Sequence, residues 1–91
     1  MRTLVATNQF KKDLKKTIKR GLDISALENV VNMLLAEEKL PEKYKDHGLA
    51  GDYIGKRECH IQPDWLLIYE YSVNQLILIL ARTGSHSDLF R

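Results

Sequence analysis

The stretch WLLIYEYSVNQLILILAR, residues 65–82, decides the fold. It contains two runs rich in Leu, Ile and Tyr, residues 65–71 and 75–82, separated by a short polar segment. Such runs are typical of β-strands, and residues 72–74 are the expected tight turn, so the stretch predicts a hairpin. The nearly continuous apolar run 76–81 is typical of a strand covered on both faces. It therefore predicts a strand in the interior of the sheet.

A strand and a basic helix are expected at the beginning of the chain. Residues 2–7 alternate weakly and predict a first strand, after which Thr7 or Asn8 can cap a helix. The apolar stripe of this helix has the spacing i, i+4, i+8 and consists of Phe10, Leu14 and Ile18. The opposite face is positively charged and consists of Lys11, Lys12, Lys15, Lys16, Lys19 and Arg20.

A second, more apolar helix follows. Residues 25–28, Ser-Ala-Leu-Glu, have the pattern of a capping box, and the helix is expected to end near Lys39, before Pro41. Its apolar side chains cover so wide an arc that we expect it to lie between the sheet and the first helix. Residues 40–52 are polar and predict a loop, and a further strand is expected at 53–61.

The order of these elements is β-α-α-β-β-β. It predicts an α+β domain in which two N-terminal helices pack on one face of a mostly antiparallel sheet. A chain of 91 residues is expected to form one domain, residues 1–91.

The positive charge is concentrated near the N-terminus. Residues 1–22 carry seven Lys and Arg against one acidic residue, whereas residues 23–91 carry seven against eleven, so the net charges are +6 and −4. This asymmetry indicates a surface for phosphates or for an acidic partner. A solvated helix face is the alternative interpretation of the lysines.

Composition also indicates where the protein acts. The single cysteine, Cys59, excludes an internal disulfide and fits a reducing cytosol, so we expect a cytoplasmic protein. The longest apolar run has six residues, 76–81, against about 20 for a membrane span, so no membrane association is expected.

The hexapeptide HIQPDW, residues 60–65, places an imidazole, a carboxylate and an indole next to an apolar strand. Two further histidines, His47 and His86, lie near predicted strand ends, so all three histidines could converge in one cleft. Imidazoles titrate near pH 6.5 and could serve as general base and general acid. The alternatives are three exposed or locally bonded imidazoles, or a metal site formed with Asp64, which the spacing does not favour.

Five other residues are candidates with an ordinary structural alternative. Asp64 could orient a histidine or merely belong to a turn. Trp65 could stack on a base or lie in the core. Arg82 and Arg57 could bind phosphate or be strand charges. Phe90 must dock on the body of the protein, a partner or a base.

Four ordered blocks resemble the YafQ branch of the RelE superfamily, toxins of bacterial type II toxin–antitoxin modules. The blocks are YKDH at 44–47, HIQPDWLLIY at 60–69, RTGSH at 82–86 and LF at 89–90. The resemblance implies a RelE-like fold and a metal-independent, cofactor-free endoribonuclease that cuts mRNA in the A site of the 70S ribosome.

The resemblance also implies roles for individual residues. His47, His60, Asp64 and His86 would be catalytic, Arg82 would bind phosphate, and Trp65 and Phe90 would position bases. We expect His60 with Asp64 as base, because a turn joins them, and His86 as acid, although the two roles could be reversed. The lysine-rich face would contact ribosomal RNA or an acidic antitoxin.

The implied partner is a DinJ-like antitoxin. Its C-terminal segment would wrap the toxin in an inhibitory heterotetramer, and its N-terminal part would bind operator DNA. Two other classes stay open on the residues alone: a non-catalytic growth inhibitor like the ParE-type gyrase poisons, and an RNA-binding module. Clustered histidines argue against the first, because a pure binding module has little need of them.

Overall fold

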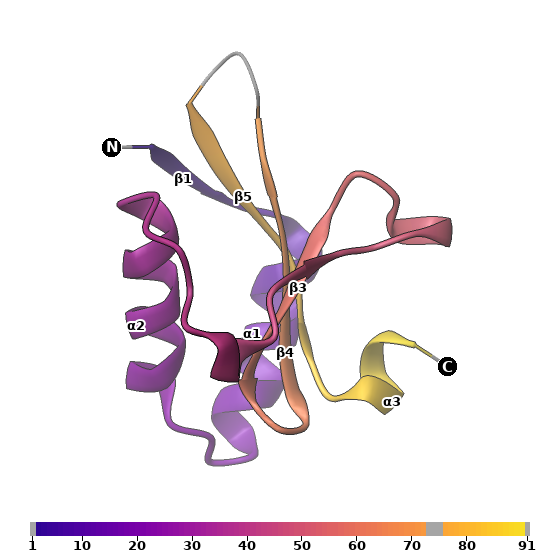
Figure 1. The fold of residues 1–91 in the computed structure, drawn as a ribbon. Helices are drawn as coiled ribbons and strands as arrows, with labels where there is room; N and C mark the ends of the chain where they lie inside the picture. The colour runs from indigo at the N-terminus through magenta and orange to yellow at the C-terminus, as the bar shows by residue number, and fades with distance from the viewer. Residues whose placement is uncertain (1, 73–75, 91) are drawn as a thin grey trace.

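The computed structural model describes residues 2–72 and 76–90, which form a mixed sheet with helices on both faces (Figure 1). The strands are β1 (Thr3–Ala6), β2 (His47–Gly48), β3 (Arg57–Gln62), β4 (Trp65–Tyr71) and β5 (Ile77–Gly84). The helices are α1 (Asn8–Lys19), α2 (Ile24–Leu35) and α3 (His86–Leu89), with the 3₁₀ turns η1 (Glu42–Tyr44) and η2 (Gly51–Tyr53). None of the helices in the described residues is long and apolar enough to cross a bilayer.

The predicted hairpin is the centre of the sheet. The strand order is β1-β5-β4-β3-β2, and among these pairs β1–β5 is parallel and the others are antiparallel. The interior position expected for residues 75–82 is confirmed, since β5 lies between β1 and β4. The α+β class and the mostly antiparallel sheet are confirmed as well. The predicted turn at 72–74 falls mainly outside the described residues.

Two apolar layers hold the sheet, because successive strand residues point to opposite faces. One layer joins α1 and α2 to the sheet and includes Phe10, Leu27, Val30, Leu34, Trp65, Leu67, Tyr69, Leu78 and Leu80. The smaller layer lies on the opposite face, under α3, and consists of Leu66, Ile68, Ala81 and Leu89. The histidines described below lie on this second face.

The buried face of α1 differs from the predicted stripe. Thr7 caps the helix, as expected, by accepting a hydrogen bond from the main-chain N–H of Phe10 at 3.0 Å. Phe10 is buried, but Ile18 is 55% exposed, and Asp13 and Thr17 are buried in its place. The face of α1 that turns to the sheet therefore differs from the apolar stripe. Asp13 is on that face because it binds Arg82 and Thr83 of β5, and the spacing of apolar residues does not predict such polar contacts.

Three predictions about α2 are wrong. Asp23 caps the helix instead of Ser25, whose main-chain N–H and hydroxyl both donate to Asp23 Oδ1, at 3.0 and 2.6 Å. The helix ends at Leu35 rather than Lys39, and the chain reverses through Glu37 at a φ of 58°. Finally, α2 is not enclosed by α1, because α1 packs on β5 and α2 packs on β3 directly (Figure 1).

The segment predicted as a loop contributes a strand to the sheet edge. Within residues 40–52, the two-residue strand β2 pairs with Arg57 and Glu58 of β3. Strand β3 starts at Arg57 rather than at residue 53, because η2 and a turn at Gly55 (φ 86°) precede it. A two-residue strand has no periodicity to detect, and the four-residue helix α3 was missed for the same reason.

Candidate active site

The three histidine rings gather where β2, β3 and the start of α3 meet. His47 lies on β2 beside β3, and its ring centroid is 6.5 Å from that of His60 on β3. Pairing of Leu66 with Gly84 brings the chain after β5 back to the β3–β4 turn. The ring of His86 therefore lies 5.5 Å from that of His60. The convergence expected from the positions of the strand ends is confirmed.

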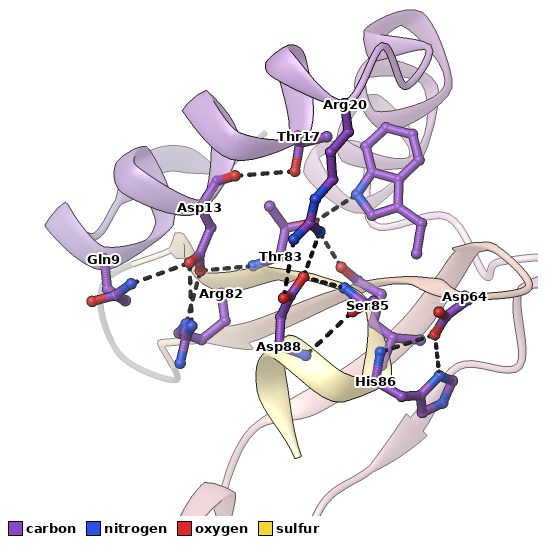
Figure 2. A network of polar contacts seen from close by, with 12 residues as sticks. Gln9, Asp13, Thr17, Arg20, Asp64, Arg82, Thr83, Ser85, His86 and Asp88 are labelled. Atoms are coloured by element: carbon purple, nitrogen blue, oxygen red, sulfur yellow. Dashed lines mark hydrogen bonds and ion pairs between the residues drawn. The ribbon is translucent and has the colours of Figure 1, made fainter. Parts of the chain in front are cut away.

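Asp64 binds His86 rather than His60. Its Oδ1 accepts hydrogen bonds from the main-chain N–H of His86 at 2.9 Å and from the Nδ1 of the same residue at 2.7 Å. These bonds from His86 hold the pKa of Asp64 below its ordinary value. The expected pairing with His60 is wrong, because Asp64 is at the tip of the hairpin and points to the neighbouring α3 (Figure 2).

The carboxylate beside His60 belongs to Glu58, which was not among the predicted site residues. Glu58 is buried, and its Oε1 lies 3.2 Å from His60 Nε2 and 3.8 Å from His47 Nε2. Residues two apart on a strand share a face, so the spacing of Glu58 and His60 was the available signal. The cluster thus contains two carboxylates, each next to an imidazole, which suits proton transfer in both directions.

The main chain orients the remaining ring nitrogens. His47 Nδ1 lies 2.6 Å from the carbonyl oxygen of Lys45, and His60 Nδ1 lies 3.4 Å from that of Pro63. A carbonyl can only accept, so the short contact to Lys45 places the His47 proton on Nδ1. In His60 the Glu58 carboxylate, which also only accepts, is nearer to Nε2 than the Pro63 carbonyl is to Nδ1, so Glu58 favours the tautomer with the proton on Nε2 and leaves Nδ1 as the basic nitrogen.

A cavity of about 540 Å³ opens beside the histidines. It is lined by Lys43, Tyr44, Lys45, His60, Ile61, Gln62, Pro63 and His86. Lys43 and Lys45 were not predicted as site residues, although Lys45 lies in the YKDH block and Lys43 directly precedes it. Two ammonium groups beside imidazoles and an aromatic ring make this cavity suitable for a nucleotide, with phosphate and base both accommodated.

Arg82 is held by a buried carboxylate. Its Nε and Nη2 donate to Oδ2 and Oδ1 of Asp13 at 2.7 and 3.2 Å (Figure 2). Gln9 and the main-chain N–H of Thr83 bind the same carboxylate. Burial raises the pKa of Asp13, but the hydrogen bonds from Arg82, Gln9 and Thr83 outweigh it and keep the pKa below its ordinary value. A phosphate would therefore compete with Asp13 for Arg82.

The other predicted binding residues have different surroundings. Trp65 is 1% exposed, and its indole N–H donates to the Thr83 hydroxyl at 2.9 Å, so it lies in the core, the alternative that the sequence left open. Phe90 is 41% exposed and packs edge-on against Tyr53, with 5.5 Å between ring centroids. Arg57 Nε lies 3.3 Å from a carboxylate oxygen of Asp46, the residue before His47.

The basic face of α1 is exposed, as expected. The residues concerned are Lys11, Lys12, Lys15, Lys16, Lys19 and Arg20. Arg20 differs from the lysines because it forms an ion pair with Asp88 of α3 at 2.6 Å (Figure 2). Lys12, Lys16 and Arg20 line a second hollow together with Arg82 and Asp88, and this hollow shares no lining residue with the histidine cavity.

Cys59 does not belong to the site. It is fully buried on the helix-covered face of β3, opposite to His60, and burial raises the pKa of its thiol to about 12. It packs as a small apolar group, as the sequence suggested.

Three of the site residues form a potential metal-binding set. Glu58, His60 and His86 each offer one ligand atom, and these atoms lie within 4.8 Å of one another. Two imidazoles and a carboxylate fit zinc or copper(II). The sequence spacing argued against a metal site formed by the three histidines with Asp64. The set found in the structure is different, because Glu58 takes the place of Asp64.

Solved structures with this fold define a class of bacterial toxins. A metal-bound toxin from Helicobacter pylori is 46% identical, with 99% of this chain and 100% of that chain covered and a TM-score of 0.93. The toxin of the Escherichia coli DinJ–YafQ complex is 37% identical over 100% of both chains, with a TM-score of 0.90.

Sequence relatives identify the family within that class. The mRNA interferase toxin YafQ of Escherichia coli strain K12 is 38% identical over 90 residues, which cover 98% of this chain and 96% of the relative. Residues 2–91 match the family described as bacterial toxin of type II toxin–antitoxin system, YafQ. The chain therefore belongs to the YafQ family, and the resemblance read from the four sequence blocks is confirmed.

Proposed function

We propose that this toxin is an mRNA endoribonuclease that cuts mRNA in the ribosomal A site and so inhibits translation. The observation that carries the proposal is the spacing of His60 and His86, whose ring centroids are 5.5 Å apart beside a nucleotide-sized cavity. Two imidazoles at this separation can reach opposite sides of one phosphate. The mRNA interferase activity of the 38% identical relative supports the same reaction class.

The proposed reaction needs only RNA and two proton-transfer groups. His60 removes the proton of a ribose 2′-hydroxyl, and O2′ then attacks the adjacent phosphorus. The P–O5′ bond breaks as the O2′–P bond forms, and His86 gives a proton to the departing O5′. The products are a 2′,3′-cyclic phosphate and a 5′-hydroxyl. DNA lacks the nucleophile and would not be cut.

Each carboxylate has a defined place in this scheme. Asp64 accepts from Nδ1 of His86 and so fixes the orientation of the ring, with Nε2 as the atom that gives the proton. Glu58 replaces Asp64 as the partner of His60, because it is the carboxylate within reach of that ring. His47 lies next to Glu58 and would share the proton or orient the base.

Positive side chains would bind the RNA. Lys43 and Lys45 line the cavity, whereas Arg57 is on the face of β3 that bears Cys59 and lines a different hollow with Asp46 and Tyr69. Arg82 would stabilise charge on the phosphoryl oxygens after exchanging Asp13 for phosphate. Phe90 is exposed and could position a base, whereas Trp65 would support the site from the core. The lysine-rich face of α1 would contact ribosomal RNA.

The test is mapping of mRNA 5′ ends after a short pulse of expression, together with cleavage by purified protein on translating 70S ribosomes. We expect discrete cuts in frame with codons, and little cutting of free mRNA or of DNA. Full cutting by both His60→Ala and His86→Ala would refute the residue assignment. DNA damage without mRNA cuts would indicate a gyrase poison, and RNA binding without cuts a non-catalytic module.

We propose that catalysis needs no metal, and that a metal would inhibit. The set Glu58, His60 and His86 would hold a transition metal and would then lose both proton-transfer groups. A 46% identical toxin of Helicobacter pylori has been solved in a metal-bound form. On ribosomes kept in Mg²⁺, cutting should persist after the toxin has been stripped with a chelator selective for transition metals, and it should fall when zinc is added. Loss of cutting by the stripped toxin, with recovery on adding zinc or copper, would refute metal independence.

We propose a DinJ-like antitoxin as partner, because a toxin 37% identical to this chain has been solved in complex with DinJ. The antitoxin would neutralise the toxin in a heterotetramer and would bind operator DNA through its own N-terminal part. A ribosomal substrate implies a cytoplasmic location. Co-expression of a small acidic protein encoded immediately upstream should restore growth and co-purify with the toxin, and failure of both would refute this partner.

A further inference from the structure

The orientation of His86 depends on α3, a helix that is too short to be stable without outside contacts. His86 is the first residue of α3, which has only four residues. A single helical turn is unstable by itself, so contacts outside the helix must fix it. The described residues around α3 provide such contacts through Asp88, which lies two positions after His86.

Asp88 closes the first turn of α3 from inside. Its Oδ2 accepts a hydrogen bond from the main-chain N–H of Ser85 at 3.0 Å, and its own N–H donates to the Ser85 hydroxyl at 3.2 Å. This reciprocal pair is a capping box around His86.

Arg20 holds the same carboxylate from outside. Its Nη1 and Nη2 donate to Oδ2 and Oδ1 of Asp88 at 2.6 and 3.2 Å, which is a bidentate pair between residues 68 positions apart (Figure 2). The hydrogen bond from Arg20 keeps the pKa of Asp88 far below its ordinary value. Arg20 follows α1, whose own position on β5 is set by Asp13 and Arg82.

The glycine at position 84 leaves room for Asp88 to approach the backbone. A Cβ at Gly84 would lie 2.9 Å from Asp88 Oδ2 and 3.0 Å from Asp88 Cβ, so only glycine allows Asp88 this close. The network therefore runs without interruption from α1 to the cavity. It connects Arg20 to Asp88, Asp88 to Ser85, and the adjacent His86 to Asp64 (Figure 2).

We propose that Asp88, held by Arg20, is a positioning residue for His86. The bidentate pair fixes the first turn of α3 against α1, so that His86 meets Asp64 and faces His60. The inference deepens the proposed nuclease function and rests on it for its kinetic consequence. It also gives Arg20 a role inside the toxin, distinct from the ribosome contact expected of the basic face.

The experiment is a double-mutant cycle with Arg20→Gln, Asp88→Asn and the double variant, assayed on translating ribosomes. The amide introduced by Asp88→Asn retains an oxygen for the Ser85 N–H, so the cap persists while the charge is lost. Misplacement by about 1 Å can cost about 100-fold in rate, so we expect each single variant to lose about 10- to 100-fold in kcat with KM unchanged. The double variant should lose no more than either single variant.

A matched ion pair provides the control. Lys56, which directly precedes β3, and Glu70 of β4 lie 3.6 Å apart, and neither lines the histidine cavity. Glu70→Gln should leave kcat and KM unchanged. Additive losses in the cycle, or a rise in KM alone for Arg20→Gln, would overturn the proposal, because Arg20 would then act directly on the ribosome.

A spectroscopic measurement keeps the proposal testable if the protein cuts no mRNA at all. In the NMR spectrum of folded Asp88→Asn, the ring Hε1 signal of His86 should shift, while that of His47, which lies outside the network, should not. An unchanged His86 signal would overturn the positioning role. Absence of cutting by the unmodified toxin would refute the nuclease function instead, so the two failures are distinguishable.

Discussion

A single carboxylate oxygen of Asp64 accepts two hydrogen bonds from His86, at 2.9 Å from the main chain and at 2.7 Å from ring Nδ1. The first bond fixes the start of α3, and the second fixes the tautomer and plane of the ring. Nε2 is then the atom of His86 that is available to give a proton. The hairpin between β3 and β4 makes this contact possible across 22 residues of sequence.

Replacing Asp64 with Asn should therefore reduce turnover more than binding. The amide oxygen can still accept a hydrogen bond, but the negative charge beside the His86 ring is lost. We expect kcat on ribosomes to fall about 10- to 100-fold with little change in KM. Asp52→Asn, a change at an exposed carboxylate in η2, is the control. Unchanged turnover of Asp64→Asn would remove Asp64 from the mechanism.

The Glu58→Gln variant tests the carboxylate that only the structure revealed. Glu58 Oε1 lies 3.2 Å from His60 Nε2 and 3.8 Å from His47 Nε2, so its charge acts on both rings. Gln is nearly isosteric and should fold, and we expect kcat to fall about 10-fold or more. The thermal unfolding midpoint shows whether the fold is intact. A fully active variant would show that the base works without this partner.

The Asp13–Arg82 pair predicts a particular dependence of stability on pH. Asp13 has a lowered pKa in the folded state, so its stabilisation is complete above the unfolded pKa of about 3.9 and is lost as the pH falls through the folded value. Asp13→Asn should cost about 2 kcal/mol at neutral pH. In urea unfolding, the free energy of unfolding should fall less between pH 7 and acid pH in the variant than in the unmodified protein. Parallel curves would contradict this linkage.

Cys59 should be chemically inert in the folded protein. Burial raises its pKa to about 12, and its side chain is fully enclosed. A disulfide reagent that reports thiolates should react after denaturation but not before. Cys59→Ala should remain active and lose about 1 kcal/mol of stability, because a small buried group is removed. Rapid labelling of the native protein would show that β3 opens readily.

Gly84→Ala tests the close approach between β5 and α3. The new Cβ would lie 2.9 Å from Asp88 Oδ2, so α3 must move. We expect a loss of about 1–3 kcal/mol, measured by thermal or urea unfolding, together with reduced turnover. Gly48→Ala is a matched change, because its new Cβ would meet no atom nearer than 3.8 Å. Equal behaviour of the two variants would argue against a tight contact at Gly84.

The residues explain which structural predictions succeeded. Long apolar runs identified β4 and β5 because strand burial leaves a strong local pattern. Errors fell on short or polar elements: β2 has two residues, α3 has four, and the buried side of α1 includes Asp13 and Thr17. The cap of α2 moved to Asp23 because several nearby polar residues satisfy the same local pattern.

The partners of the site residues were harder to predict than the site itself. His47, His60 and His86 were expected together, since strand ends and neighbouring strands were visible in the sequence. The carboxylate partner of His60 depended on the direction of the Asp64 side chain at the hairpin tip. Asp64 points to His86, so Glu58 is the carboxylate next to His60. The partners of Arg82 and Arg20 lie 69 and 68 positions away, where local patterns carry no information.

The amino-acid sequence by itself determined the class of fold, the family and the three histidines of the site, because hydrophobic periodicity and ordered motifs are local properties of a chain. The tertiary structure decided the pairings: Asp64 with His86, Glu58 with His60, Asp13 with Arg82, and Asp88 with Arg20. Hydrogen bonds and ion pairs act over about 3 Å. Such partners are therefore defined only after packing of the helices on the sheet has brought distant segments into contact.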